Sequence, residues 1–163
     1  MGIIKRIDAI TEIPEKYQAE YLSAPKSVKI ELTANCNYKC SFCVKSIRPD
    51  NSQMDRKFYS RIIREMRDAG VEELGVFYIG ESFTCKWLPE AIKEVKEVGF
   101  PYVFLTTNGS AATPERVEAC MEAGLDSLKF SVNFSDIHHF QKIAQVDPKL
   151  YGKALKNIES ARK

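Results

Sequence analysis

Four short segments of the chain have the pattern of β-strands, in which apolar and polar residues alternate or an apolar run is continuous. They are residues 27–33, 73–79, 102–106 and 127–133. Apolar residues three and four positions apart predict an amphipathic helix after each strand. In the first of these helices the expected buried stripe is Phe58, Ile62, Met66 and Ala69. Strands alternating with helices, with about 25 to 30 residues between the last three strand starts, predict an α/β fold with a parallel sheet and right-handed crossovers.

The first and fourth predicted strands each have a polar face, which is unusual because helices normally cover both faces of a parallel sheet. Lys29 and Glu31 share that face in the first strand, and Lys129, Ser131 and Asn133 share it in the fourth. Two interpretations are open. Either the polar faces line a common interior where Glu31 or Lys129 touches a substrate, or a Lys–Glu pair bridges the sheet.

Residues 1–26 lack this alternation, and we assign them to an N-terminal extension of a domain that spans residues 27–163. Isoleucines at positions 3, 4, 7 and 10 recur at helical spacing and predict one or two short helices in the extension. After the fourth strand, the pattern predicts further helix as far as the end of the chain, interrupted near Asp147 and Pro148.

Composition adds limits on compartment and partners. The chain has 163 residues, of which 44% are hydrophobic and 28% charged, as expected for one globular domain. Its 24 basic and 22 acidic residues nearly balance, so charge gives no reason to expect nucleic acid or an anionic membrane as a partner. No apolar run approaches the ~20 residues of a membrane span, and the N-terminus lacks the apolar region of a signal peptide. The expected compartment is the cytoplasm.

Three of the five cysteines, Cys36, Cys40 and Cys43, lie in the loop directly after the first predicted strand, with the spacing C-x3-C-x2-C. In a reducing compartment an odd, crowded set of cysteines indicates metal binding rather than disulfides. Three thiolates can bind one soft metal centre and leave it one protein ligand short. A tetrahedral zinc site would need a fourth ligand, for which Cys85 is the candidate. Cys85 and Cys120 are otherwise interpreted as buried thiols of the core.

The other candidate site residues also follow predicted strands, at the carboxyl ends where parallel α/β sheets bind ligands. Gly80, Glu81 and Ser82 follow the second strand, and Thr107, Asn108 and Gly109 follow the third. Ser131 and Asn133 end the fourth. Because all four strand ends meet at one edge of a parallel sheet, the sequence predicts a single pocket there.

In this order along the chain, the cysteine motif, Gly80-Glu81, Thr107-Asn108-Gly109 and Ser131-Val132-Asn133 resemble the radical S-adenosylmethionine (radical SAM) superfamily over residues 27–160. The resemblance implies a partial (β/α) barrel, a [4Fe–4S] cluster and S-adenosylmethionine (SAM) bound to the cluster's fourth iron. It implies reductive cleavage of SAM to a 5′-deoxyadenosyl radical that abstracts hydrogen from an unidentified small-molecule or peptide substrate. It also implies an electron donor such as flavodoxin or ferredoxin.

The resemblance further implies roles for individual residues. The cluster ligands would be Cys36, Cys40 and Cys43. Phe42 would contribute its backbone and ring near the adenine, and the segment at Gly80 and Glu81 would receive the amino group of SAM. The ribose hydroxyls or the carboxylate of SAM would meet polar groups of the third and fourth strand ends: Asn108, Ser131 and Asn133.

The chain departs from the family pattern in length. Four βα units are predicted where the family usually has six, and the glycine and proline that usually flank Gly80-Glu81 are absent. We therefore expect a fragment of a longer enzyme, with an open sheet edge at the fourth strand. The alternative functions are a non-catalytic iron–sulfur or zinc-binding protein, serving electron transfer or structure, and a truncated domain that keeps the cluster without turnover.

Overall fold

The computed structural model describes residues 13–46 and 51–161, which form one four-stranded parallel sheet in the order β1-β2-β3-β4. The strands are β1 (Ser27–Lys29), β2 (Glu73–Gly75), β3 (Tyr102–Thr107) and β4 (Ser127–Phe130). The helices are α2 (Arg56–Asp68), α3 (Leu88–Val98), α4 (Pro114–Glu122), α5 (Ile137–Ala144) and α6 (Lys149–Ser160). Three single 3-10 turns are η1 (Glu15–Tyr17), η2 (Val44–Ser46) and η3 (Ser82–Thr84).

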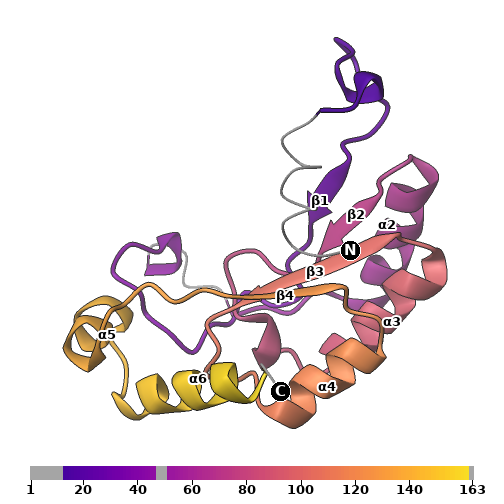
Figure 1. Cartoon of the computed structure of the whole chain (residues 1–163). Coiled ribbons are helices and arrows are strands. Elements are labelled where there is room, and N and C mark those ends of the chain that lie inside the picture. The colour runs from indigo at the N-terminus through magenta and orange to yellow at the C-terminus, as the bar shows by residue number, and fades with distance from the viewer. Residues whose placement is uncertain (1–12, 47–50, 162–163) are drawn as a thin grey trace.

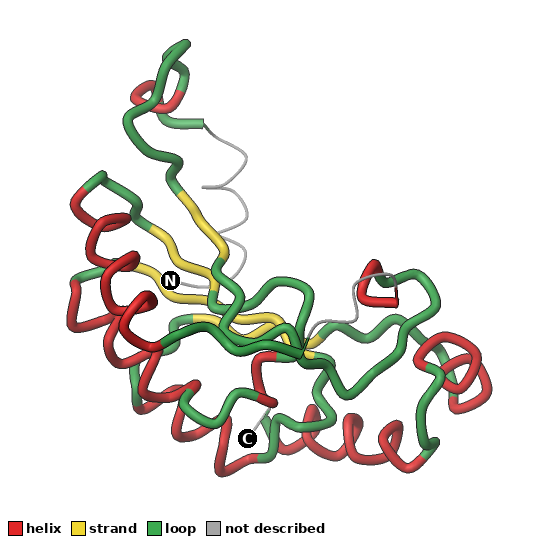
Figure 2. Tube along the Cα trace, turned by 180° about the vertical axis from the view of Figure 1, so that it is seen from behind, coloured by secondary structure: helices red, strands yellow, loops and turns green. Residues whose placement is uncertain are grey.

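The helices fall into two groups. Helices α2, α3 and α4 lie side by side along the sheet, whereas α5 and α6 lie beyond the carboxyl ends of the strands (Figure 1, and from behind in Figure 2). The four parallel strands and their connecting helices confirm the predicted α/β fold class with four βα units. Within the described part of the chain, no helix is long and apolar enough to cross a membrane.

Three of the strands are shorter than predicted because regular pairing stops before their carboxyl ends. Beyond each strand a hydrogen bond still joins the chain to its neighbour: Ile30 N–H to Gly75 O at 2.8 Å, Val76 N–H to Phe104 O at 3.0 Å, and Ser131 N–H to Thr107 O at 2.7 Å. The polar residues after these points are therefore held close together while their backbones leave the regular sheet.

The main core lies between the sheet and α2 to α4, and its fully buried side chains include Leu74, Leu105 and Ile92. The expected stripe on α2 is correct in part: Ile62 and Met66 pack against the core, whereas Phe58 and Ala69 are exposed. Tyr59 and Ile63 are fully buried, whereas Phe58 is 43% exposed. The pattern passed over Tyr59 because tyrosine ranks as partly polar; here its hydroxyl donates to the backbone oxygen of Ala91 at 2.9 Å, which permits complete burial.

Just beyond β1, which forms one edge of the sheet, the chain pairs with residues 52–54. Thr33 forms an antiparallel bridge with Gln53, and backbone hydrogen bonds of 2.9 Å join Ala34 to Ser52 and Met54 to Leu32. The opposite edge of the sheet is β4, the strand that was expected to be an edge.

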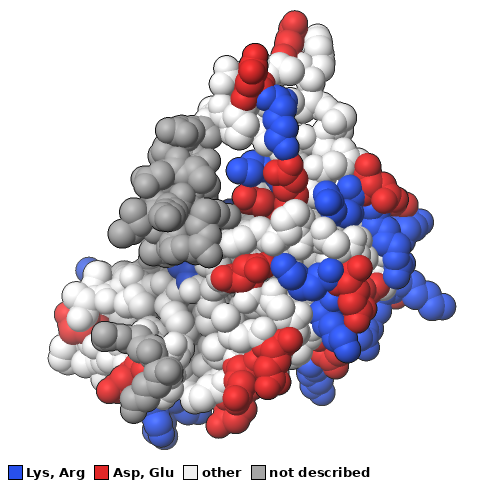
Figure 3. All heavy atoms as spheres, turned by 45° about the vertical axis from the view of Figure 1, so that its right-hand side comes forward, with Lys and Arg blue, Asp and Glu red and all other residues white. Residues whose placement is uncertain are grey.

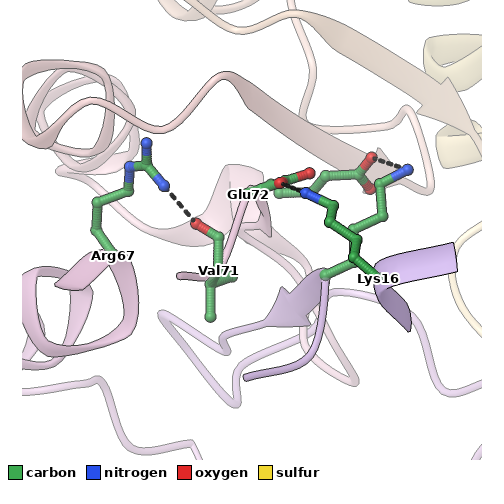
Figure 4. A network of polar contacts seen from close by, with 6 residues as sticks. Lys16, Arg67, Val71 and Glu72 are labelled. Carbon is green, nitrogen blue, oxygen red and sulfur yellow. Dashed lines mark hydrogen bonds and ion pairs between the residues drawn. The ribbon is translucent and has the colours of Figure 1, made fainter. Parts of the chain in front are cut away.

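The start of the described chain contacts the loop that precedes β2. Lys16 forms an ion pair with Glu72, and Lys26 pairs with Glu73 at 3.7 Å (Figure 4). In the same view the guanidinium of Arg67 donates to the backbone oxygen of Val71 at 3.3 Å. The isoleucine pattern at positions 3 to 10, with its predicted helices, lies outside the described residues.

Charges of both signs alternate over the helical face of the molecule (Figure 3). Several pair across neighbouring elements, as Arg64 does with Glu94 at 3.3 Å and Lys96 with Asp126 at 2.9 Å. This arrangement matches the nearly balanced composition.

Candidate metal-cluster and cofactor site

One cavity at the carboxyl ends of the strands brings together the residues that the sequence indicated as ligands of the cluster and of SAM. Its lining includes the whole set: Cys36, Cys40, Cys43, Phe42, Gly80, Glu81, Asn108, Ser131 and Asn133. The cavity lies between the cysteine loop, defined as residues 33–46, and the ends of β2, β3 and β4. The parallel sheet thus places four sequence-distant segments around one space, as predicted.

The three thiols of the cysteine loop are partly buried and close enough to affect one another. Burial, with the neighbouring Cys36 and Cys43, raises the pKa of Cys40 to about 11, and burial also raises the pKa of Cys36. Two backbone amides donate toward the sulfurs, from Tyr38 to Cys36 and from Lys45 to Cys43, each at 3.5 Å. Such donors favour negatively charged sulfur, which is the form that binds metal.

The three thiols are partly buried and line one cavity, as ligands of an iron–sulfur cluster would. Among residues 13–46 and 51–161, no three histidine, cysteine or acidic side chains converge closely enough to hold one metal ion. In a [4Fe–4S] cluster each cysteine binds a different iron, so the thiolates surround the cluster without meeting at one point. The thiols, the amide donors and the adjoining cavity therefore fit such a cluster.

Cys85 and Cys120 lie apart from this loop. Both side chains are fully buried in the main core, and neither lines a cavity that contains the other three cysteines. Their interpretation as core thiols agrees with this burial. The zinc site that would use Cys85 as fourth ligand finds no support in the geometry.

The cysteine loop packs against α5 and α6. The amides of Lys39 and Ser41 donate to the backbone oxygens of Ala144 and Ile143 at the end of α5, each at 2.9 Å. The ring of Tyr38 contacts Phe140 edge-on, with 5.4 Å between ring centroids. We call this second hydrophobic cluster the loop core; it comprises Tyr38, Phe140 and Ala144, against which Phe134 and Tyr151 pack, together with the partly buried Cys36 and Cys40. The sequence predicted helices at α5 and α6 but not this contact.

The backbone at Gly80 lies directly against the start of the cysteine loop. A Cβ atom at Gly80 would lie 2.0 Å from the backbone oxygen of Thr33, so no side chain fits there. The next amide, of Glu81, donates to the backbone oxygen of Asn35 at 2.8 Å. Glycine at position 80 is therefore required for the close approach of the first two strand ends.

The carboxylate of Glu31 also binds this segment. It accepts hydrogen bonds from the amides of Ile79 at 2.9 Å and Gly80 at 2.7 Å. Sequence reasoning offered a substrate contact or a pair with lysine for Glu31, and missed this backbone role. Lys129 was named with Glu31 in the sequence analysis, and its side chain is exposed on β4.

The carboxylate of Glu81 joins the ends of the second and third strands. It is 3% exposed and accepts from the Thr107 hydroxyl at 2.7 Å, the Asn108 amide at 2.8 Å and the Phe83 amide at 3.1 Å. Burial raises the pKa of this carboxyl, while the three hydrogen bonds and the nearby Arg116 oppose that rise. The side chain is thus occupied by protein donors, although the residue lines the cavity.

A second polar network joins the cysteine loop to the end of β3. The side chain of Asn108 donates to Asn37 at 2.8 Å and accepts from the Ser110 hydroxyl at 2.8 Å, and Asn37 in turn donates to Ser110 at 2.7 Å. From α6, the buried Asn157 donates to the backbone oxygen of Gly109 at 2.8 Å. Sequence reasoning singled out Asn108 but missed its partners; the one signal was an amide side chain between two of the clustered cysteines.

The remaining candidates lie on the open side of the cavity. Phe42 is 64% exposed, and Asn133 donates to the hydroxyl of Ser131 at 3.1 Å. Hydroxyl and amide groups at such a rim can bind the hydroxyls or carboxylate of a ligand. The individual roles of Phe42, Ser131 and Asn133 toward SAM stay predictions.

Together, the fold and the site define an α/β partial barrel with three neighbouring cysteines at the carboxyl ends of its strands. Comparison with known families agrees. The model of the radical SAM superfamily matches residues 30–163, and the chain belongs to that family. The family uses a [4Fe–4S] cluster and SAM, which confirms the cofactors indicated by the sequence.

Two curated relatives are each 31% identical to this chain. GTP 3′,8-cyclase of Chlorobaculum tepidum matches over 122 residues, covering 74% of this chain and 36% of that protein. The S-adenosylmethionine-dependent nucleotide dehydratase of Lacinutrix mariniflava matches over 140 residues, covering 82% and 29%. This chain therefore spans about a third of the length of these relatives.

Among solved structures, SuiB of Streptococcus suis bound to S-adenosylmethionine is similar, with a TM-score of 0.70 and 22% identity. The match covers 96% of this chain and 36% of SuiB. At this identity the likeness establishes the fold, and it confirms the radical SAM type of partial barrel.

Proposed function

We propose that this chain is the cluster- and SAM-binding part of a radical SAM enzyme. The observation that supports this most directly is the single cavity shared by the three thiols and the strand-end polar groups. Cys36, Cys40 and Cys43 would hold the cluster, which would supply the electron for reductive cleavage of SAM to a 5′-deoxyadenosyl radical that abstracts hydrogen from a substrate. The electron comes from a donor such as flavodoxin or ferredoxin.

The residues of the chain would bind and orient both cofactors. Cys36, Cys40 and Cys43 hold the cluster. The segment at Gly80 and Glu81, which lines the cavity, receives the amino group of SAM. Phe42 covers the adenine, and the hydroxyl and amide groups at the ends of β3 and β4 orient the ribose and carboxylate. We also propose that the domain begins near residue 27, with residues 1–26 as an extension.

The names of the two relatives support a small-molecule substrate. One relative is a GTP cyclase and the other a nucleotide dehydratase, so both act on nucleotides. SuiB has been crystallised with a precursor peptide, but its 22% identity relates only to fold. A nucleotide or similar small molecule is therefore favoured over a peptide.

Anaerobic reconstitution with iron and sulfide tests the proposal. After chemical reduction, the electron paramagnetic resonance spectrum should show a [4Fe–4S] cluster and should change on addition of SAM, with 5′-deoxyadenosine detectable by chromatography. Cys120→Ser should give the same spectrum and the same response to SAM as the wild type, because Cys120 lies in the main core.

Two results would contradict the proposal. A spectrum unaffected by SAM would indicate a non-catalytic iron–sulfur protein. A metal centre that is lost in Cys85→Ser would restore the zinc interpretation. A cluster that responds to SAM without releasing 5′-deoxyadenosine would identify a domain that binds both cofactors but needs the rest of a longer enzyme for turnover.

A further inference from the structure

The ammonium group of Lys29 lies against one wall of the cofactor cavity. Lys29 is the last residue of β1 and is exposed, and its ammonium nitrogen lies over the ring of Phe77, 5.2 Å from the ring centre. Phe77 lines the cavity that the three clustered cysteines also line. The ring therefore separates the Lys29 side chain from the cavity by about one ring's width or less, at the side of the cavity formed by β1 and β2.

The stem of Lys29 is held in this place by packing over Gly75. Gly75 is the partner of Lys29 in the neighbouring strand, and both face away from the main core, into which the preceding residue, Leu74, points. A Cβ atom at Gly75 would lie 2.9 Å from the ring of Phe104, 3.0 Å from that of Phe77 and 3.1 Å from Cγ of Lys29. The absence of a side chain at Gly75 thus leaves the space in which the two rings and the lysine stem meet.

The charge of Lys29 has no acidic partner among the described residues. None of the ion pairs between them includes Lys29. Lys26, at the start of the same strand, pairs with Glu73 at 3.7 Å. Glu31, two residues beyond Lys29, accepts hydrogen bonds from backbone amides of the second strand end instead. The lysine at the amino end of β1 is therefore paired with an acid, whereas the one at the carboxyl end, where parallel sheets bind ligands, is not.

The cavity itself has no positive side chain. Among the described residues that line it there is no lysine or arginine, and the one acid, Glu81, has its carboxylate occupied by three protein donors. A lysine ammonium is a compact charge with three donors on a flexible stem, and the face of an aromatic ring leaves those donors available to a ligand. Lys29 is thus placed to supply the positive charge at this wall.

We propose that Lys29 binds an anionic group of the substrate, a phosphate or a carboxylate, beside Phe77. This inference deepens the proposed function and rests on it. The carboxylate of SAM is assigned to the ends of β3 and β4, whereas β1 is the opposite edge of the sheet, so the two anionic groups would bind at separate places. Nucleotides, on which the two curated relatives act, carry phosphates.

The first test measures protection of the Lys29 amine. The reconstituted protein with SAM is acetylated at low ionic strength in the presence of ribose 5-phosphate, ribonate or ribose, and each lysine is followed by mass spectrometry. The phosphate or the carboxylate probe, or both, should slow acetylation of Lys29, and uncharged ribose should not. Protection by one anion alone identifies which of the two groups is bound. Lys93, exposed on α3, should react equally in all samples.

The second test compares Lys29→Met with Lys93→Met and the wild type by calorimetric titration with the anion that protects. Lys29→Met should weaken binding of that anion about tenfold, as expected for the loss of one charge-assisted hydrogen bond. Lys29→Arg should keep most of the affinity, and Lys93→Met all of it. The change of the cluster spectrum on addition of SAM should be the same in all four proteins.

Three results would contradict the inference. Equal anion affinity in Lys29→Met and wild type, or acetylation of Lys29 that no anion slows, would overturn it alone if the cluster still responds to SAM. A cluster in Lys29→Met that no longer responds to SAM would assign the lysine to SAM instead of the substrate. A wild-type protein without a cluster would overturn the proposed function, and this inference with it.

Discussion

The described part of the chain contains two hydrophobic cores that differ in size, origin and function. The main core is built by successive βα units, so its members come from neighbouring stretches of the chain. The loop core joins Tyr38 to residues 134–151, at the far end of the sequence. The main core keeps the strand ends together, whereas the loop core holds the cysteines.

This division separates global stability from the geometry of the site. The loop core has three fully or nearly buried members, Tyr38, Phe140 and Ala144, and the rest of it is partly exposed. Regions with few buried contacts open at lower free energy than the core of the same protein. The cysteine loop should therefore be able to open while the sheet stays folded, and substitutions in the two cores should have separable effects.

The largest effect is expected from Cys40→Ser. Serine at one of the three proposed ligand positions should abolish most iron binding after anaerobic reconstitution, while circular dichroism shows an unchanged fold. Cys120→Ser should do the opposite: it should keep the iron but lower the free energy of unfolding by about 1–3 kcal/mol, because it buries a hydroxyl in the main core. Full iron content in Cys40→Ser would disprove the assignment.

Phe140→Ala and Ile63→Ala compare the two cores directly. Removal of either fully buried side chain should lower the stability of the core that contains it by about 2–5 kcal/mol. In Phe140→Ala, hydrogen exchange should accelerate at the amides of Lys39 and Ser41, with little change in the sheet. In Ile63→Ala, protection of backbone amides from hydrogen exchange should fall throughout the sheet and its helices. Uniform loss of protection in both variants would show that the cores unfold as one unit.

Gly80→Ala examines the contact between the first two strand ends. The added methyl group would meet the backbone of Thr33, and we expect a loss of about 3 kcal/mol in denaturant unfolding. Gly152→Ala provides the control, since its Cβ meets nothing within 4 Å and alanine favours the α6 helix by up to about 1 kcal/mol. A neutral Gly80→Ala would mean that the strand ends can move apart freely.

The smallest expected effect is the contribution of Glu81 to the pH dependence of the free energy of unfolding. Burial dominates and raises the pKa of its carboxyl above the ordinary 4.5, so the folded protein favours the protonated form. Stability from this group is therefore fully present below pH 4.5 and is lost as the pH rises through the folded pKa. The free energy of unfolding of the wild type, minus that of Glu81→Gln, should decrease over that range. An increase would show that the hydrogen bonds to Thr107, Asn108 and Phe83 outweigh burial.

The sequence predicted the alternation of strands and helices and the pocket at the strand ends, because periodicity is local and a parallel sheet aligns its strand ends. It did not predict the partners of Glu31, Asn108 or Tyr38. Those contacts join residues far apart in sequence, as with Asn37 and Ser110, which are 73 positions apart. No periodic pattern records such a pairing. Tyr59 on α2 was missed for a related reason, since its hydroxyl is buried with the backbone oxygen of Ala91, 32 positions away, as acceptor.

The bonds from Lys39 and Ser41 to the end of α5 have a consequence for synthesis of the protein. The cysteines leave the ribosome about 100 residues before Ile143 and Ala144, which at about 5–20 residues per second is a delay of several seconds. During that interval the loop has no support from α5 and α6. Iron loading should therefore follow completion of the C-terminal helices, and ribosome-bound chains that end before α5 should not retain a cluster.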